Sequence, residues 1–218
     1  EDIEFDPKDI PDYKECRHII GLDWGMSDFG AIVWCMVDGY GKHWIWNYEK
    51  IRNLNPIQVA GIIRSYDNMI GFNTGIPVVC GRDVGKELPS RSDKPISITE
   101  MMLEQGVNMY PKAAYNAFTK GKNNFIEPGI YHICQLAQQK KLYISTAPHM
   151  KNLWNEILTC YFREGKIPKR NEMRFDGIEA LRYACIMSVY AQMHPDNVVS
   201  RIYGNKHKRA KTSYSIYN

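Results

Sequence analysis

The sequence has no apolar run of about 18 residues, the length that a membrane-spanning helix needs, so we expect no membrane partner. Its six cysteines form no C-x-x-C pair, and Cys35, Cys80 and Cys185 lie inside apolar stretches. This distribution is typical of buried free thiols in a reducing compartment. The sequence also lacks a signal peptide and opens without Met, so we expect it to be a piece of a longer polypeptide.

Several catalytic motifs are missing as well. None of the six histidines stands in an H-x-x-x-H or H-E-x-x-H pattern, which argues against a zinc site, and there is no G-x-S-x-G nucleophile elbow. The chain has four Gly-Lys pairs, at 41–42, 85–86, 121–122 and 165–166, and none continues to Ser or Thr. Without a Walker A loop, we expect no ATP hydrolysis by that route.

The net charge is only +4, but its distribution along the chain is uneven. Residues 1–16 are rich in Asp and Glu, whereas 201–211 carry Lys and Arg without an acid. With 44% hydrophobic residues, the part between these ends suits one globular domain, which we place at 17–195. The ends are then an acidic N-terminal segment, 1–16, and a C-terminal stretch, 196–218, that is either a basic arm or a solvated tail.

The order of hydrophobic patterns predicts an α/β fold. Runs at 17–25, 31–38 and 42–51 read as three strands joined by turns too short for parallel crossovers, so they form an antiparallel meander. The third run alternates, which predicts Trp44, Trp46 and Tyr48 on one face of the sheet, in the core. Helices and short strands then alternate: a helix capped by Asn55, a strand at 76–85, a helix at 97–106 with a Ser97–Glu100 capping box, helices at 129–141 and 149–165, and a last helix at 175–193. The order predicts a mixed sheet with helices on both faces.

Two carboxylates follow apolar strands in matching contexts. Asp23 stands in GLDWG and Asp83 in GRDVG. A buried anion is costly unless it is paired or bound to a cation, and the glycines leave room for a metal ion or a phosphate to approach. If the two strands are neighbours, both acids lie at one end of the sheet. Each also has a structural explanation, as a turn cap for Asp23 or as the partner of a neighbouring basic residue for Asp83.

A third acid, Asp176, opens the last predicted helix. As a helix N-cap completed by Glu179 three residues later, it has a sufficient structural role of its own. Three such acids together instead suit Mg²⁺ or Mn²⁺, which take oxygen ligands. Two such ions bridged by a shared carboxylate can activate water and stabilise the leaving oxygen of a phosphodiester.

These segments together resemble the nuclease domain of the bacteriophage terminase large subunit. The resemblance rests on HIIGLDWG followed by the meander, VVCGRDVG after the first helix, and FDGIEALRYA at the last long helix, and it spans 17 to about 193. It implies a ribonuclease H-like (RuvC-like) fold and a metal-dependent endonuclease that cuts double-stranded DNA during genome packaging with little sequence preference. Asp23, Asp83 and Asp176 match the family's three catalytic, metal-binding acids, although the family often has Glu at the second position. Asp28 and Glu179 are candidate outer-shell acids.

The resemblance also implies partners and a location. An ATPase domain would precede this part in the same polypeptide, and residues 1–16 would be the remnant of the connection. The portal protein and the small terminase subunit would be partners in the cytoplasm of the infected host cell. DNA phosphates need cationic contacts, and the candidates are Lys112, Lys120, Lys122, Lys169, Arg170 and Arg174, each of which can also be an ordinary surface residue.

Other functions remain open on the sequence alone. A junction resolvase or transposase-like nuclease keeps the fold and changes the substrate. An actin-like kinase fragment shares an acid after its first strand but needs a second domain. A DNA-binding or portal-binding module without catalysis would use the three acids only as caps.

Overall fold

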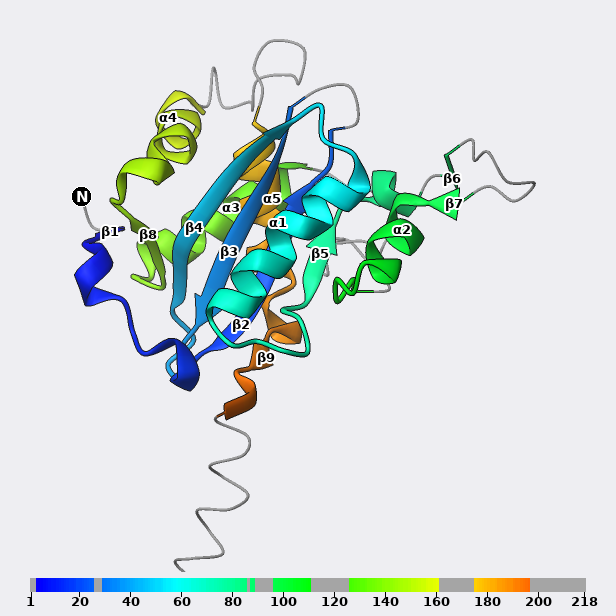
Figure 1. Cartoon of the computed structure of the whole chain (residues 1–218). Coiled ribbons are helices and arrows are strands. Elements are labelled where there is room, and N and C mark those ends of the chain that lie inside the picture. The colour runs from blue at the N-terminus through cyan, green and yellow to red at the C-terminus, as the bar shows by residue number, and fades with distance from the viewer. Residues whose placement is uncertain are drawn as a thin grey trace, which may run out of the picture.

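The computed structural model describes residues 3–25, 29–85, 87–88, 96–110, 126–160 and 175–196. Their centre is a mixed sheet in the order β1-β8-β4-β3-β2-β5, with β9 pairing onto β2 (Figure 1). The strands are β1 (Glu4–Phe5), β2 (Arg17–Asp23), β3 (Phe29–Val37), β4 (His43–Arg52), β5 (Val78–Cys80), β8 (Leu142–Ser145) and β9 (Gln192–Met193). A separate pair consists of β6 (Glu87–Leu88) and β7 (Ile96–Ser97).

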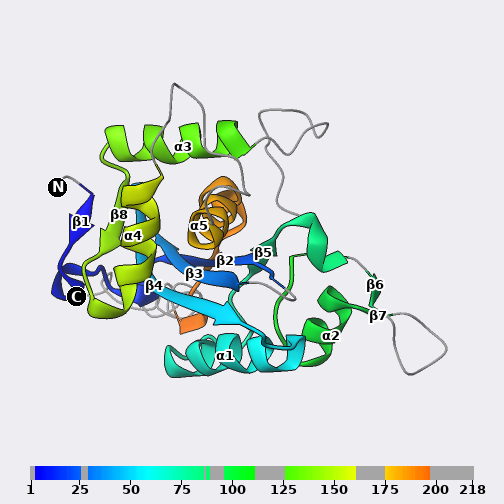
Figure 2. The same cartoon turned by 90° about the horizontal axis from the view of Figure 1, so that it is seen from above.

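Helices cover both faces of the sheet (Figure 2). Helices α1 (Pro56–Met69) and α2 (Ile98–Glu104) pack on one face, and α3 (Ile126–Gln138), α4 (Lys151–Thr159) and α5 (Asp176–Ile186) on the other. Each face has its own hydrophobic core, because β2 and β3 are buried on both sides. The predicted meander, parallel strands and helical layers are thus confirmed. No helix among the described residues combines the length and the apolar character needed to cross a membrane.

Two of the predicted helix starts are confirmed in detail. Asn55 caps α1 with Pro56 in the first turn, and its side chain and that of Gln58 exchange hydrogen bonds with each other's backbone. Ser97 and Glu100 form the same reciprocal box at the start of α2. These caps satisfy N–H groups that the first helical turn leaves without partners.

The prediction for β4 was wrong in one respect. Between the pairs Trp34–Asn47 and Cys35–Ile45, strand β4 has one residue more than β3. Tyr48 therefore packs in the core under α5, whereas Trp46 packs against the core under α1, on the other face of the sheet. A β-bulge reverses the alternation of side chains beyond it, which strict alternation along the sequence cannot reveal.

The last predicted helix is shorter than the sequence pattern indicates. Helix α5 ends at Ile186, and the chain continues through a 3₁₀ turn (Ser188–Tyr190) into β9. Gln192 and Met193 pair antiparallel with the start of β2, so backbone hydrogen bonds to the sheet replace those of another helical turn. The acidic N-terminal segment also contributes to the sheet, since β1 pairs with β8 at its edge.

Candidate metal and nucleic-acid site

Strands β2 and β5 are parallel neighbours. A site shared by Asp23 and Asp83 requires this arrangement, because the two acids follow these strands. Gly21 pairs with Val79, and Leu22 pairs with Cys80. Asp23 is the last residue of β2, and a 3₁₀ turn (Arg82–Gly85) that contains Asp83 follows β5. Both chain positions therefore lie at the same end of neighbouring strands. Asp23 is 7% exposed, and the side chain of Asp83 lies outside the described residues.

Helix α5 lies directly on β2 because Gly21 has no side chain. A Cβ atom at Gly21 would stand 1.9 Å from the Ala180 carbonyl oxygen, so a larger residue would displace the helix. Since β9 leads the chain from α5 to the start of β2, the helix runs opposite to the strand. Asp23 lies two residues beyond Gly21 along the strand, a distance of about 6.7 Å. Asp176 lies four residues before Ala180 along the helix, a distance of about 6 Å in the same direction. Asp23 and Asp176 therefore lie at the same end of the α5 side of the sheet, the upper end in Figure 1.

Asp176 does not cap α5, so the structural role considered from the sequence is wrong. The residue at the N-cap position is Phe175, which makes no side-chain cap hydrogen bond. The acceptor comes from α4 instead: Glu156 Oε2 accepts the Gly177 N–H at 2.7 Å and lies 3.4 Å from the Ile178 nitrogen. The carboxylate of Asp176, which is 7% exposed, is thus not needed to satisfy the helix terminus.

Glu156 is a residue of this end of the sheet that the sequence patterns did not single out. It is 8% exposed, and its other oxygen, Oε1, lies 3.4 Å from both the Tyr48 hydroxyl and the Lys50 ammonium. A Cβ atom at Gly177 would stand 2.9 Å from Glu156 Oε2 and 2.9 Å from Tyr48 Cε2. Glycine at 177 therefore lets the carboxylate of α4 reach the backbone of α5.

The electrostatics of this end reflect its crowded carboxylates. Burial raises the pKa of Glu156, and the negative charge of Asp176 raises it further. The hydrogen bond from the Gly177 N–H and the positive charge of Lys50 lower that pKa in part. Burial also raises the pKa of Tyr183, with added repulsion from carboxylates that include Asp23. For the Cys80 thiol, burial and then Asp23 raise the pKa to about 12. Groups on β5, α4 and α5 therefore experience the charges of the two acids, and a bound cation would relieve that repulsion.

The remaining candidates differ in what the structure describes. Glu179 forms an ion pair with Arg182, which is 2% exposed and lies 4.6 Å over the Tyr183 ring. A role for Glu179 in an outer shell stays a prediction. The other candidates lie outside the described residues, namely Asp28, Lys112, Lys120, Lys122, Lys169, Arg170 and Arg174.

Within the described residues, no three His, Cys, Asp or Glu side chains gather closely enough to hold a metal ion. Asp23 and Asp176 are two of the three acids that the sequence singles out, and the third side chain is not part of that description. Their oxygen donors suit hard divalent ions.

A groove of about 360 Å³ lies elsewhere, between the N-terminal strand and α4, lined by Glu4, Trp154 and Leu158 among others. Strand β1 is at the edge of the sheet, with β8, β4 and β3 between it and β2. The groove is therefore separate from the end of β2 where the acids lie.

Solved structures provide the comparison that sequence searches do not, since no family model and no curated protein matches the chain. The nuclease domain of the P22 large terminase superposes with a TM-score of 0.68 and 21% identity, over 90% of this chain and 92% of that one. The large terminase of the thermophilic bacteriophage D6E, in complex with ADP, matches with a TM-score of 0.63 and 11% identity, over 87% of this chain and 43% of that one. The large terminase nuclease of the thermophilic phage G20c, with bound cobalt, matches with a TM-score of 0.50 and 17% identity, over 78% of this chain and 80% of that one. The chain has the ribonuclease H-like fold of large terminase nuclease domains.

Proposed function

We propose that this chain is the nuclease domain of a bacteriophage large terminase and that it cuts double-stranded DNA with the help of divalent metal ions. One observation carries the proposal: in this fold, the Gly21–Ala180 contact brings Asp23 and Asp176 to the same end of the sheet. The parallel pairing of β2 with β5 directs the turn that contains Asp83 toward that end as well. A shared fold alone does not fix function, whereas an arrangement of acids at one end of the sheet supports a specific chemistry.

The carboxylate oxygens of these three acids are donors of the kind that Mg²⁺ or Mn²⁺ prefers, which supports the proposal of a metal site. Asp23, Asp83 and Asp176 are the residues that would hold such ions, with Asp23 at the end of the central strand between the other two segments. Because Glu156 satisfies the start of α5, Asp176 can serve as a ligand without leaving the helix uncapped. When bound, such ions supply an activated water and offset charge on the leaving oxygen. The G20c large terminase nuclease, a structural neighbour, was solved with bound cobalt.

The chain's own residues fix where these ligands stand. Asp23 is held by β3, whose Ala31 pairs with it, and the residue before it, Leu22, pairs with Cys80 of β5. Asp176 is held by the packing of α5 on Gly21 and by the Glu156 cap. Rigid placement of ligands lets the ions and the phosphate meet without further reorganisation, which is the main contribution of a protein to phosphoryl chemistry.

The partners follow from the same proposal. The match to the D6E large terminase covers less than half of that protein, which was solved with ADP. We propose that a corresponding ATPase domain precedes this domain in one polypeptide. The portal protein, the small terminase subunit and the cytoplasm of the infected host complete the proposed setting.

A plasmid assay tests the proposal. We expect the wild-type protein to convert supercoiled DNA to nicked and linear forms with Mn²⁺ or Mg²⁺ and to be inactive in EDTA. Asp23→Asn, Asp83→Asn and Asp176→Asn should each abolish cutting. Asp67→Asn is the matched control, because Asp67 is a buried carboxylate of α1 on the opposite face of the sheet. Full cutting by the Asp23 variant would refute the assignment, and preferential cleavage of four-way junctions over linear duplex would favour a resolvase.

A further inference from the structure

Two cations stand on one face of β4 close to the candidate site. Lys50 and Arg52 are two residues apart on this strand, so their side chains point to the same side of the sheet as Tyr48, which packs under α5. Glu49 points to the other side, where its Oε1 accepts a hydrogen bond from Tyr66 of α1. The alternation of β4 therefore separates these positive charges from the adjacent acid.

The ring of Phe29 holds both cations in place. The Lys50 ammonium lies 4.8 Å and the Arg52 guanidinium 4.6 Å from the ring centroid. Phe29 pairs with Arg52 across the β3–β4 ladder, so the contact is built into the register of the strands. A cation that lies over an aromatic ring can still donate hydrogen bonds from the N–H groups that point away from the ring.

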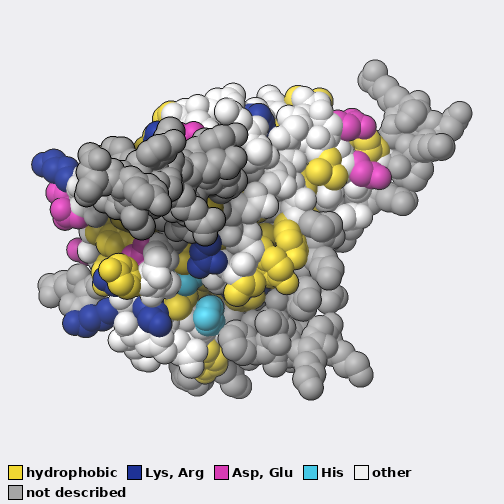
Figure 3. Space-filling view, turned by 90° about the horizontal axis from the view of Figure 1, so that it is seen from below, with side chains coloured by type: hydrophobic (Ala, Val, Ile, Leu, Met, Phe, Trp, Pro, Cys, Tyr) yellow, Lys and Arg dark blue, Asp and Glu magenta, His cyan; other side chains and the backbone are white. Residues whose placement is uncertain are grey.

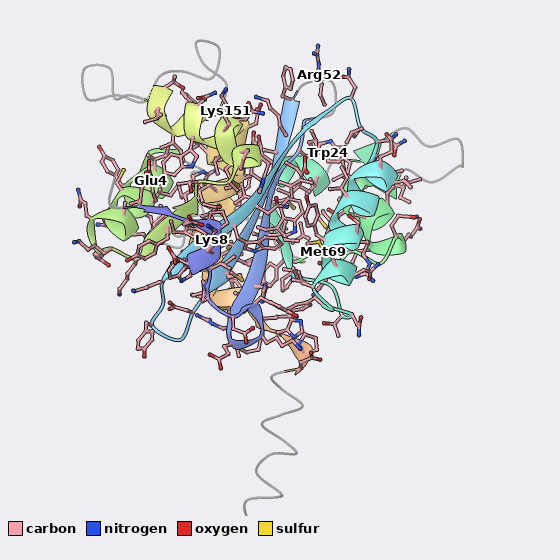
Figure 4. The ribbon with its side chains drawn as sticks, turned by 60° about the vertical axis from the view of Figure 1, so that its left-hand side comes forward. Glu4, Lys8, Trp24, Arg52, Met69 and Lys151 are labelled. Atoms are coloured by element: carbon pink, nitrogen blue, oxygen red, sulfur yellow. The ribbon has the colours of Figure 1, made fainter. Side chains whose placement is uncertain are left out.

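Both cations are accessible and close to Asp23. Arg52 is exposed, and the Lys50 side chain is 30% exposed. Lys50 pairs with Ala31, which in turn pairs with Asp23, so Lys50 and Asp23 occupy one row two strands apart, a Cα spacing of about 10 Å. Figure 4 shows Arg52 at the same upper end of the molecule as Trp24, the residue after Asp23.

We propose that Lys50 and Arg52 bind backbone phosphates of the DNA strand next to the phosphate held at the acidic site. This inference rests on the proposed nuclease function and assigns it a substrate contact. A strand of duplex DNA presents a phosphate every 3.4 Å or so along the axis, so about 10 Å spans only a few nucleotides. Contacts of this kind carry no sequence preference.

The opposite end of the molecule provides the matched control. Lys42 precedes β4 and lies 5.3 Å over the Tyr143 ring, so it is also a lysine on an aromatic face. Figure 3 views the molecule from that end, where the Lys and Arg side chains drawn in colour are scattered rather than gathered in one patch. Like Lys50→Gln, Lys42→Gln removes one positive charge from a lysine that lies over an aromatic ring, but it does so far from Asp23.

The experiment measures binding of a fluorescent 30-base-pair duplex by anisotropy in EDTA, from 50 to 300 mM salt. Arg52→Gln is the first variant, because Lys50 also contacts Glu156. We expect each of Arg52→Gln and Lys50→Gln to weaken binding roughly 10-fold at 0.1 M salt and to lower the slope of log K against log salt by about 0.9. Lys50→Arg, which retains the charge, should bind like the wild type, and so should Lys42→Gln.

The outcomes separate this inference from the proposed function. If the wild type cuts plasmid DNA while Arg52→Gln and Lys50→Gln keep the wild-type affinity and salt slope, the phosphate contacts are refuted and the nuclease assignment stands. Equal weakening by Lys42→Gln would also refute them, because the effect would then be one of total charge. If the wild type binds duplex DNA through these residues without cutting it, the contacts stand and the nuclease assignment fails. Absence of duplex binding by the wild type in EDTA also refutes the phosphate contacts, and plasmid cutting with Mn²⁺ decides the nuclease assignment separately.

Discussion

Replacement of Glu156 tests how the start of α5 is held. Its carboxylate accepts the Gly177 N–H at 2.7 Å, stands 3.4 Å from the Ile178 nitrogen, and is 8% exposed. A side-chain cap contributes about 1 kcal/mol to stability, and a buried hydrogen bond to a charged group roughly 1.5–3 kcal/mol. We therefore expect Glu156→Ala to lower the free energy of unfolding by about 2–4 kcal/mol. For a domain of this size, that corresponds to a fall in Tm of roughly 5–15 °C.

Glu156→Gln keeps an acceptor oxygen for Gly177 and should cost only about 1 kcal/mol. Thermal unfolding followed by circular dichroism measures both variants, and Mn²⁺ titration calorimetry measures ion affinity below the unfolding transition. We expect the alanine variant to bind Mn²⁺ about 10-fold more weakly, because Asp176 stands on the turn that loses its cap. Asp67→Ala is the control, since Asp67 accepts the Ile76 N–H and pairs with Arg64 on the other face. It should lose stability and keep the wild-type Mn²⁺ affinity. An alanine variant of Glu156 that melts at the wild-type temperature would refute the capping role.

Two further predictions concern stability. Burial lowers the pKa of His18, whose Nε2 donates to the Tyr13 carbonyl at 2.7 Å, from 6.5 to about 4. The unfolded chain then binds a proton that the folded chain does not, so stability is present above pH 6.5 and is lost as the pH falls toward 4. Between pH 7 and pH 5, His18 alone should contribute about 2 kcal/mol to the loss of stability in urea unfolding, and His18→Gln should remove that share; an unchanged pH dependence would contradict the assignment. Gly21→Ala should destabilise the fold by about 3 kcal/mol or more in the same assay, because its Cβ would overlap the Ala180 carbonyl oxygen; wild-type stability would show that α5 does not contact β2 as described.

The sequence was sufficient to predict the parts of the site that depend on local pattern. The apolar runs before Asp23 and Asp83 predicted buried strands, and the structure pairs those strands in parallel. The helical pattern that begins near Asp176 predicted α5. The juxtaposition of Asp23 and Asp176 follows once Gly21 is seen against Ala180, a contact between segments more than 150 residues apart that no local pattern encodes.

The cap at α5 could not be predicted for the same reason. Glu156 stands three residues after Leu153 on the buried side of α4, and a carboxylate in that position is the only local signal. Which helix end it faces depends on the packing of α4 against α5. Lys50 is a similar case, because its place in the row of Asp23 depends on the register of three strands and on the bulge in β4. Each of these features is set by tertiary packing rather than by the period of the sequence.

The central claim is that Asp23, Asp83 and Asp176 hold divalent ions together. The most direct measurement is the anomalous difference density of a crystal soaked in Mn²⁺. The account predicts manganese peaks within about 2.5 Å of carboxylate oxygens from all three residues, at the end of β2 and β5 where α5 begins. Side chains of Asp23 and Asp176 directed to separate regions, or manganese bound only elsewhere, would contradict it.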